Sequence, residues 1–124
     1  MKKFSEIEYV RPDMVAEQER IKEYTEALKG VRSYEELRGL FMEEKEREDI
    51  WATMAEVAQV RYTVDTRDSF YEGEVQFWNE TIPMMHLLIQ KAEKVILESP
   101  FIKQFAEEFG DFFVKNMEVG QKLA

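Results

Sequence analysis

The sequence is dominated by two long segments that favour helix and flank one polar turn. Residues 34–64 contain no proline, and residues 69–98 contain only Pro83. Between them, residues 65–68 read Asp-Thr-Arg-Asp, and Asp and Thr side chains hydrogen-bond their own backbone, which ends one helix and begins another. We therefore predict a long antiparallel helical hairpin, kinked near Asn79 or Glu80 because Pro83 removes a backbone donor and clashes with the preceding turn.

Polar residues that accept hydrogen bonds from free backbone N–H groups mark the starts of the helices. Asp13 follows a proline and is the expected N-cap of a first helix. Ser33 opens the first arm of the hairpin with a capping box, since Glu36 three residues later can return a bond to the Ser33 backbone. Asp68 or Ser69 is expected to cap the second arm.

Further elements are expected on both sides of the hairpin. Residues 1–12 predict an extended arm whose aromatic side packs on a neighbouring element. A helix over residues 14–29 follows, and Gly30 ends it in the left-handed conformation. After the hairpin, a helix rich in phenylalanine begins around Pro100, and Gly110 divides it.

The composition supports an all-α fold, because five glycines and three prolines in 124 residues leave few helix breakers. We predict one helical domain over residues 1–124, an irregular bundle of the antiparallel hairpin and shorter helices. With 26 acidic and 17 basic residues the net charge is −9, which disfavours nucleic acid and anionic membranes as partners. We expect no secretory signal and no apolar run long enough to span a bilayer, and the lack of cysteine fits a cytoplasmic location.

Metal chemistry is disfavoured because the chain has one histidine and no cysteine. A zinc site of the HExxH type needs two histidines, and a carboxylate di-iron site needs two Glu-x-x-His repeats. The residue three before His86 is Pro83, so even one repeat is missing. We expect no catalytic residue and no metal ligand in this chain. His86 itself is interpreted as a core or boundary residue with one hydrogen bond, with a role as general base as the alternative.

Three further groups have a structural and a functional interpretation. The charged segment 43–50 is expected to be a solvent-exposed stretch of helix, helped by pairing of Glu43 with Arg47, rather than a pair of catalytic carboxylates. At the hairpin corner, Arg61, Asp65 and Asp68 are expected to form ion pairs, or to contact a neighbouring domain. The aromatic residues near the C-terminus are expected to form core, or a surface for another part of the protein, rather than a ligand cavity; they are Phe101, Phe105, Phe109, Phe112 and Phe113.

Three segments resemble the amino-terminal region of the oligoendopeptidase F group of zinc metallopeptidases, which are relatives of thimet oligopeptidase. They are FSEIEYVRPD at residues 4–13, TVDTRDSFYEGE at residues 63–74 and ESPF at residues 98–101. The similarity covers nearly all of the chain in the same order. The sequence departs from this group at Tyr62, where a histidine is expected.

The resemblance implies a cytoplasmic, mostly helical enzyme that hydrolyses short peptides, with the zinc-binding HExxH motif located beyond this chain. The zinc would polarise the scissile carbonyl group and activate water. The amino-terminal helices would enclose the substrate channel, with the C-terminal catalytic domain and the oligopeptide substrate as partners. The resemblance assigns no catalytic, metal-binding or substrate-binding residue here. The alternative is a stand-alone all-α interaction module that forms a dimer.

Overall fold

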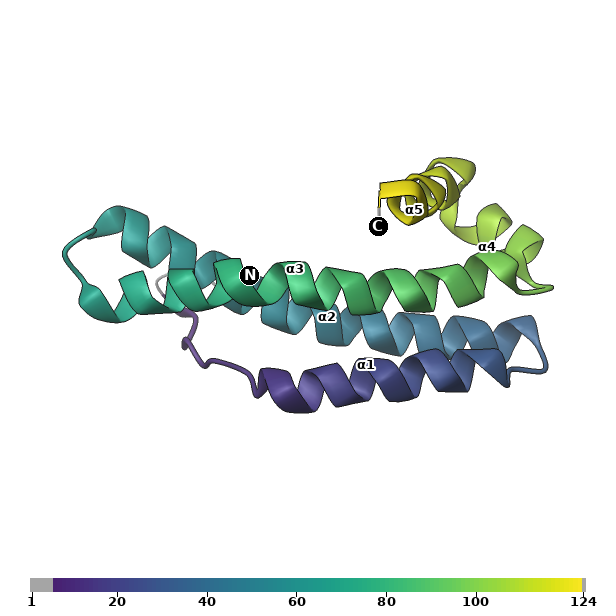
Figure 1. The fold of residues 1–124 in the computed structure, drawn as a ribbon, viewed down its shortest axis with the longest axis horizontal. Coiled ribbons are helices and arrows are strands. Elements are labelled where there is room, and N and C mark those ends of the chain that lie inside the picture. The colour runs from purple at the N-terminus through teal and green to yellow at the C-terminus, as the bar shows by residue number, and fades with distance from the viewer. Residues whose placement is uncertain (1–5, 124) are drawn as a thin grey trace.

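Two antiparallel helices form the long axis of the molecule (Figure 1). The computed structural model describes residues 6–123, and this part of the chain contains five helices and no strand. They are α1 (Met14–Lys29), α2 (Tyr34–Val64), α3 (Ser69–Glu98), α4 (Ile102–Phe109) and α5 (Asp111–Leu123). The all-α prediction and the long hairpin are both confirmed, and at 1.5 Å per residue each hairpin helix is roughly 45 Å long.

The shorter helices cover one end of the hairpin and leave the other end to the N-terminal arm. α1 lies along α2 and α3 over part of their length, whereas α4 and α5 turn back over the end where α2 begins and α3 finishes (Figure 1). Near the hairpin corner, residues 6–12 lie against α3 through Tyr9 and Arg11. The predicted arm is confirmed for these residues, and Phe4 lies outside the described part of the chain.

The helix caps follow the sequence signals, with two differences. Asp13, Ser33 and Asp68 each accept a hydrogen bond from a backbone N–H of the first helical turn. The Glu36 carboxylate, however, accepts from the backbone N–H of Arg32 at 3.0 Å, one residue before the expected partner. Gly30 has a φ of −102°, so the predicted left-handed conformation at this glycine is wrong, and its N–H closes the last turn by bonding to a carbonyl three residues back.

A glycine in a backbone conformation closed to other residues separates α4 from α5. Gly110 has φ 98° and ψ 148°, a combination that is strained for any side chain larger than hydrogen. The predicted division at Gly110 is therefore confirmed. Pro83, in contrast, does not interrupt α3. Pro83 and Asn79, whose carbonyl group loses its helical donor, are both exposed, so water can bond to that carbonyl.

Two apolar clusters hold the helices together. One joins the ends of α1, α2 and α3 to α4 and α5; its buried members are Leu28, Leu37, Phe41, Ala92, Ile96, Phe105, Val114 and Met117. The other lies nearer the corner between α1, α2 and α3; its buried members are Met14, Ile21, Trp51, Ala58, Trp78 and Met85. Where the two clusters meet, five polar side chains of α1, α2 and α3 lie near one another. We call them the polar layer, and they are Arg20, Tyr24, Glu44, Glu48 and Glu93.

Residues 43–50 are helical and most of them are exposed, as expected, but the expectation of a solvent-exposed stretch is wrong at Glu44 and Glu48. Glu44 is only 3% exposed and forms an ion pair with Arg20 of α1, and Glu48 is half-buried. The predicted pairing of Glu43 with Arg47 is absent from the described ion pairs. Helical spacing explains the difference, because residues three and four apart share a face and Glu44 therefore faces the core together with Phe41.

Candidate functional site

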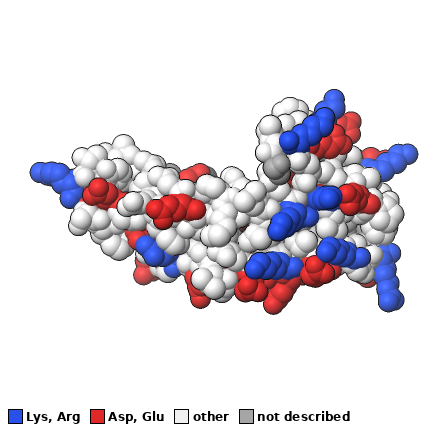
Figure 2. Space-filling model, in the orientation of Figure 1, with Lys and Arg blue, Asp and Glu red and all other residues white. Residues whose placement is uncertain are grey.

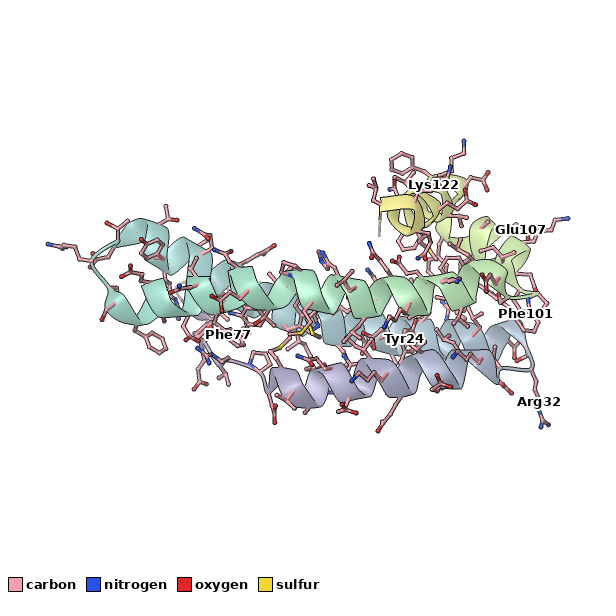
Figure 3. All side chains as sticks on the ribbon, in the orientation of Figure 1. Tyr24, Arg32, Phe77, Phe101, Glu107 and Lys122 are labelled. Carbon is pink, nitrogen blue, oxygen red and sulfur yellow. The ribbon has the colours of Figure 1, made fainter. Side chains whose placement is uncertain are left out.

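The N-terminal arm is fixed to α3 by a group of polar and aromatic side chains. The Tyr9 hydroxyl donates to Glu74 Oε1 at 2.7 Å and accepts from Trp78 Nε1 at 3.0 Å. Arg11 Nε donates to the same Glu74 oxygen at 3.0 Å. The Arg11 guanidinium group lies 3.9 Å from the centre of the ring of Phe77, the residue of α3 that Figure 3 labels. The hydrogen bond from Arg11 lowers the pKa of Glu74, so this buried carboxylate is satisfied by the arm.

The candidate residues of the hairpin corner do not form one cluster. Arg61 Nη1 donates to the Tyr71 hydroxyl at 2.8 Å, and Arg61 Nη2 donates to the Ile7 carbonyl oxygen of the arm. Asp65 pairs with Arg67 at 3.2 Å, and Asp68 caps α3. The predicted ion pair between Arg61 and Asp65 is therefore wrong, because the arm and Tyr71 take the guanidinium group.

A groove of about 550 Å³ lies between α2 and α3, and we call it the α2–α3 groove. Its carboxylates are Glu48, Asp49, Glu56 and Glu93. Its apolar wall consists of Trp51, Ala52, Ala55, Ile82 and Ile89, and the remaining lining residues are Lys45, His86 and Gln90. Four acidic groups face one lysine, so the groove carries formal negative charge. Its volume lies within the range of small-molecule sites.

Burial changes the acid–base properties of two carboxylates in this groove. Burial raises the pKa of Glu48 to about 8, and a hydrogen bond to Glu44 adds to the increase. Burial also raises the pKa of Glu93, against a smaller opposing effect of Lys45. A carboxyl group with a pKa of about 8 is largely protonated at neutral pH, so Glu48 adds little negative charge to the groove there.

Two buried polar atoms of the groove have no hydrogen-bond partner in the described structure: Trp51 Nε1, a donor, and Gln90 Oε1, an acceptor. Trp51 is 5% exposed and stacks on Trp78, with ring centroids 6.3 Å apart. The two indole N–H groups differ in their hydrogen bonding: that of Trp78 donates to the Tyr9 hydroxyl, whereas that of Trp51 has no acceptor among the described residues. Each atom has less than 1 Å² of accessible surface, so both lie inside the packed wall of the groove, out of reach of a molecule in it.

His86 lies at this groove but is exposed, which contradicts its interpretation as a core residue. It makes no hydrogen bond among the described residues. Sequence reasoning also missed Glu48, Glu93, Trp51 and Gln90 as members of a common site. The spacing of Phe41, Glu44, Glu48 and Trp51 was the available signal, since it places the two glutamates on the core face of α2.

The C-terminal phenylalanines form core, as expected. Phe105 is fully buried, and Phe105, Phe109 and Phe113 all contact the ring of Phe41. Phe112 differs because it is 78% exposed on the outer face of α5.

A second groove, of about 470 Å³ between α1 and α3, gathers lysines that are spread through the sequence. Lys22, Lys29, Lys91 and Lys94 line it, and Figure 2 shows basic side chains grouped over these helices. Lys22 and Lys29 are paired with glutamates of their own helix. Glu26 and Glu98 line the same groove, so carboxylates partly balance the charge of the lysines.

The described residues provide neither a metal site nor a membrane span. No group of three or more histidine, aspartate or glutamate side chains in residues 6–123 is arranged to hold a metal ion. With one histidine and no cysteine, the chain does not offer the ligands of a zinc centre. None of the described helices combines the length and apolar character needed to cross a bilayer.

A family model described as the peptidase M3 N-terminal domain matches residues 4–124. The chain belongs to this family. The M3 domain seen here resembles a crystal structure assigned to oligoendopeptidase F, with a TM-score of 0.91 and 28% identity over 97% of this chain. It also resembles PZ peptidase A with an inhibitor, with a TM-score of 0.90 and 26% identity over 95% of this chain.

The M3 domain spans 21% of the length of each of these two solved proteins. A comparison with curated proteins gave no match. The resemblance to the amino-terminal region of oligoendopeptidase F is confirmed, because the family model describes a peptidase N-terminal domain and both solved structures carry peptidase names.

Proposed function

We propose that this chain is the amino-terminal helical domain of a cytoplasmic zinc metallopeptidase that hydrolyses short peptides, and that it forms part of the wall of the substrate channel. The observation that carries the proposal is the likeness to two peptidases, at TM-scores of 0.91 and 0.90, over almost the whole chain. Zinc and the HExxH motif would come from the C-terminal catalytic domain, since this chain has a single histidine.

The shape of the domain supports a role as a wall rather than a catalytic centre. A hairpin roughly 45 Å long is longer than a compact domain of this size needs, and an elongated rigid element can line one side of a deep channel. The enclosure would admit oligopeptides and exclude folded proteins. It would act by limiting access, while the catalytic domain supplies the metal that activates water.

Exposed apolar side chains on α5 also support attachment to a larger protein. Phe112 is 78% exposed, Val119 51% and Leu123 81%, and their spacing of seven and four residues places them on one face of the helix. In the proposal, the rest of the peptidase covers this face.

The test is a cleavage assay on the complete gene product with quenched fluorescent peptides of increasing length. Cleavage should be restricted to short peptides, disappear with a zinc chelator and return when zinc is added. Cleavage of folded proteins at a comparable rate, or activity that chelators leave intact, would contradict the proposal.

The alternative of a stand-alone interaction module would use the same α5 face to form a dimer. Sedimentation of the 124-residue chain distinguishes the two, because a dimer of this kind should dissociate when Phe112 is replaced by serine. If the chain sediments as a monomer at all concentrations, the dimer module is excluded.

A further inference from the structure

We propose that the surface of α2 and α3 beneath the N-terminal arm is a recognition site for extended peptide segments that contain a tyrosine and, two residues later, an arginine. We call this surface the arm site. Residues 6–12 occupy it as a ligand within the chain, and a separate segment with the same pattern can take their place. The inference does not depend on the proposed function, because it uses no property of a peptidase.

The arm lies on the hairpin in the manner of a bound peptide. Exposure alternates along it, since Glu8 and Val10 are exposed whereas Tyr9 between them is half-buried. A period of two is that of an extended chain, so Tyr9 and Arg11 lie on the same side. Arg11 is more exposed than Tyr9, but its guanidinium group forms an ion pair with Glu74. Two side chains, two residues apart, therefore anchor the arm.

The arm supplies the polar partners of two buried groups in the arm site. Glu74 is 6% exposed, and among the described residues its carboxylate bonds only to the Tyr9 hydroxyl and the Arg11 guanidinium group. The N–H of Trp78, which is buried as well, donates only to the Tyr9 hydroxyl. The hairpin therefore presents a carboxylate that takes a cation and an indole N–H that takes an acceptor, and these two groups define the chemistry of the ligand.

An arginine and a tyrosine meet these requirements better than other side chains. The Arg11 guanidinium group bonds to both oxygens of Glu74 and lies over the Phe77 ring (Figure 3). The Tyr9 hydroxyl donates to the carboxylate and accepts from the indole, while its ring contacts Tyr71 edge-on. Lysine lacks the planar fork and phenylalanine lacks the hydroxyl, so the arm site distinguishes a Tyr-x-Arg segment from close analogues.

Two further contacts involve the main chain of the arm. Arg61 donates to the carbonyl oxygen of Ile7, and the Met54 sulfur accepts from the N–H of Val10 at 3.4 Å. Main-chain groups are present in every peptide, so these contacts favour an extended segment without selecting its sequence. The covalent link to α1 through Pro12 raises the local concentration of the arm, but it takes part in none of these contacts.

The experiment uses the 124-residue chain with Tyr9→Phe and Arg11→Gln, which remove both polar anchors of its own arm and keep most of their bulk. The ligand is the acetylated and amidated peptide of residues 6–13, and the readout is the indole N–H resonance of Trp78 by NMR. Trp78 should shift in a saturable manner toward its position in the unsubstituted chain, because its N–H regains the tyrosine acceptor. Trp51, whose N–H has no acceptor among the described residues, is the internal control and should move little.

The matched peptide carries Tyr9→Phe and Arg11→Gln as well. We expect its affinity to be at least about tenfold lower, the effect of losing a charge-assisted hydrogen bond. A peptide with Glu8→Gln, which changes an exposed residue, should bind like the parent peptide. The unsubstituted chain should bind the parent peptide at least about tenfold more weakly than the double variant does, because its own arm competes at an effective concentration of about millimolar.

If the double variant is unfolded, circular dichroism replaces NMR: the parent peptide should restore the helical signal, and the matched peptide should not. No shift of Trp78 and no such recovery at millimolar peptide would overturn the inference, as would equal affinity for the parent and matched peptides. It would also be overturned if both chains bound the parent peptide equally, which would place the peptide on another surface. A shift of Trp78 that only the unsubstituted chain produces, and no peptide, would instead assign the arm site to the arm of a second copy.

Discussion

The hydroxyl group of Tyr9 is the point at which the N-terminal arm bonds to two side chains of α3, and Tyr9→Phe removes only this group. The ring contacts of Tyr9 with Phe70 and Tyr71, at centroid distances of 6.1 and 5.6 Å, remain available to phenylalanine. The variant therefore isolates the hydrogen bonds of the hydroxyl from the packing of the arm.

The expected cost follows from what each partner loses. Trp78 is 2% exposed, so its Nε1–H would be left buried without an acceptor, at about 1–3 kcal/mol. Glu74 would lose one donor but keep Arg11, which adds about 1 kcal/mol. We expect Tyr9→Phe to lower the free energy of unfolding by about 2–4 kcal/mol. Burial raises the pKa of Tyr9 to about 12, so the hydroxyl is a donor throughout the neutral range.

Urea unfolding followed by tryptophan fluorescence measures this change. With an m-value of about 2 kcal/mol per molar urea, the midpoint should fall by roughly 1–2 M. Tyr62→Phe is the matched control, since the Tyr62 hydroxyl makes no hydrogen bond among the described residues. In a Trp78→Phe background, Tyr9→Phe should lower the free energy of unfolding by less, because no buried indole N–H then loses its acceptor. A Tyr9→Phe midpoint equal to that of the control would refute the reasoning.

Three other perturbations test the backbone and the polar layer. Gly110→Ala should lower the free energy of unfolding by about 1–3 kcal/mol, because a φ of +98° strains alanine even though the added Cβ would meet nothing within 4 Å. At Gly39 the added Cβ also meets nothing within 4 Å but the backbone is helical, so Gly39→Ala should stabilise the protein by about 0.5–1 kcal/mol. Thermal unfolding compares the two variants, and equal effects would exclude backbone strain at Gly110. Arg20→Met leaves Glu44 buried without its cation and should cost about 3–5 kcal/mol in urea unfolding, against about 0–1 kcal/mol for Lys29→Met, which breaks an exposed pair. Because the pKa of Glu48 is raised to about 8 in the folded protein, the stability it contributes is complete below its unfolded pKa near 4.3 and is lost as pH rises through 8. Glu48→Gln should therefore flatten the fall in melting temperature between pH 5 and 8, and Glu46→Gln, on an exposed position of the same helix, should not; identical profiles would show that Glu48 titrates normally.

The sequence was sufficient for the helices because local signals define them. Asp13, Ser33 and Asp68 accept bonds from nearby backbone, and Gly110 adopts a conformation that other residues avoid. These effects act within a few residues, so they can be predicted without knowing the tertiary structure.

The site could not be predicted in the same way, because it depends on what each helix packs against. The spacing of Glu44 and Glu48 identifies the face of α2 on which they lie, but only the fold supplies Arg20 of α1 as the partner of Glu44. The unpartnered N–H of Trp51 has no sequence signature at all. Arg61 shows the same limitation, since its partner Tyr71 lies on the following helix and its partner carbonyl on the arm.

The polar layer also determines where α1 lies along the hairpin. Apolar faces tolerate sliding, because one leucine or methionine replaces another with little change in burial. A displacement of α1 by one helical turn, about 5.4 Å, would separate Arg20 from Glu44 and leave a charged carboxylate in an apolar environment. The pair therefore favours the one axial position of α1 in which Arg20 meets Glu44.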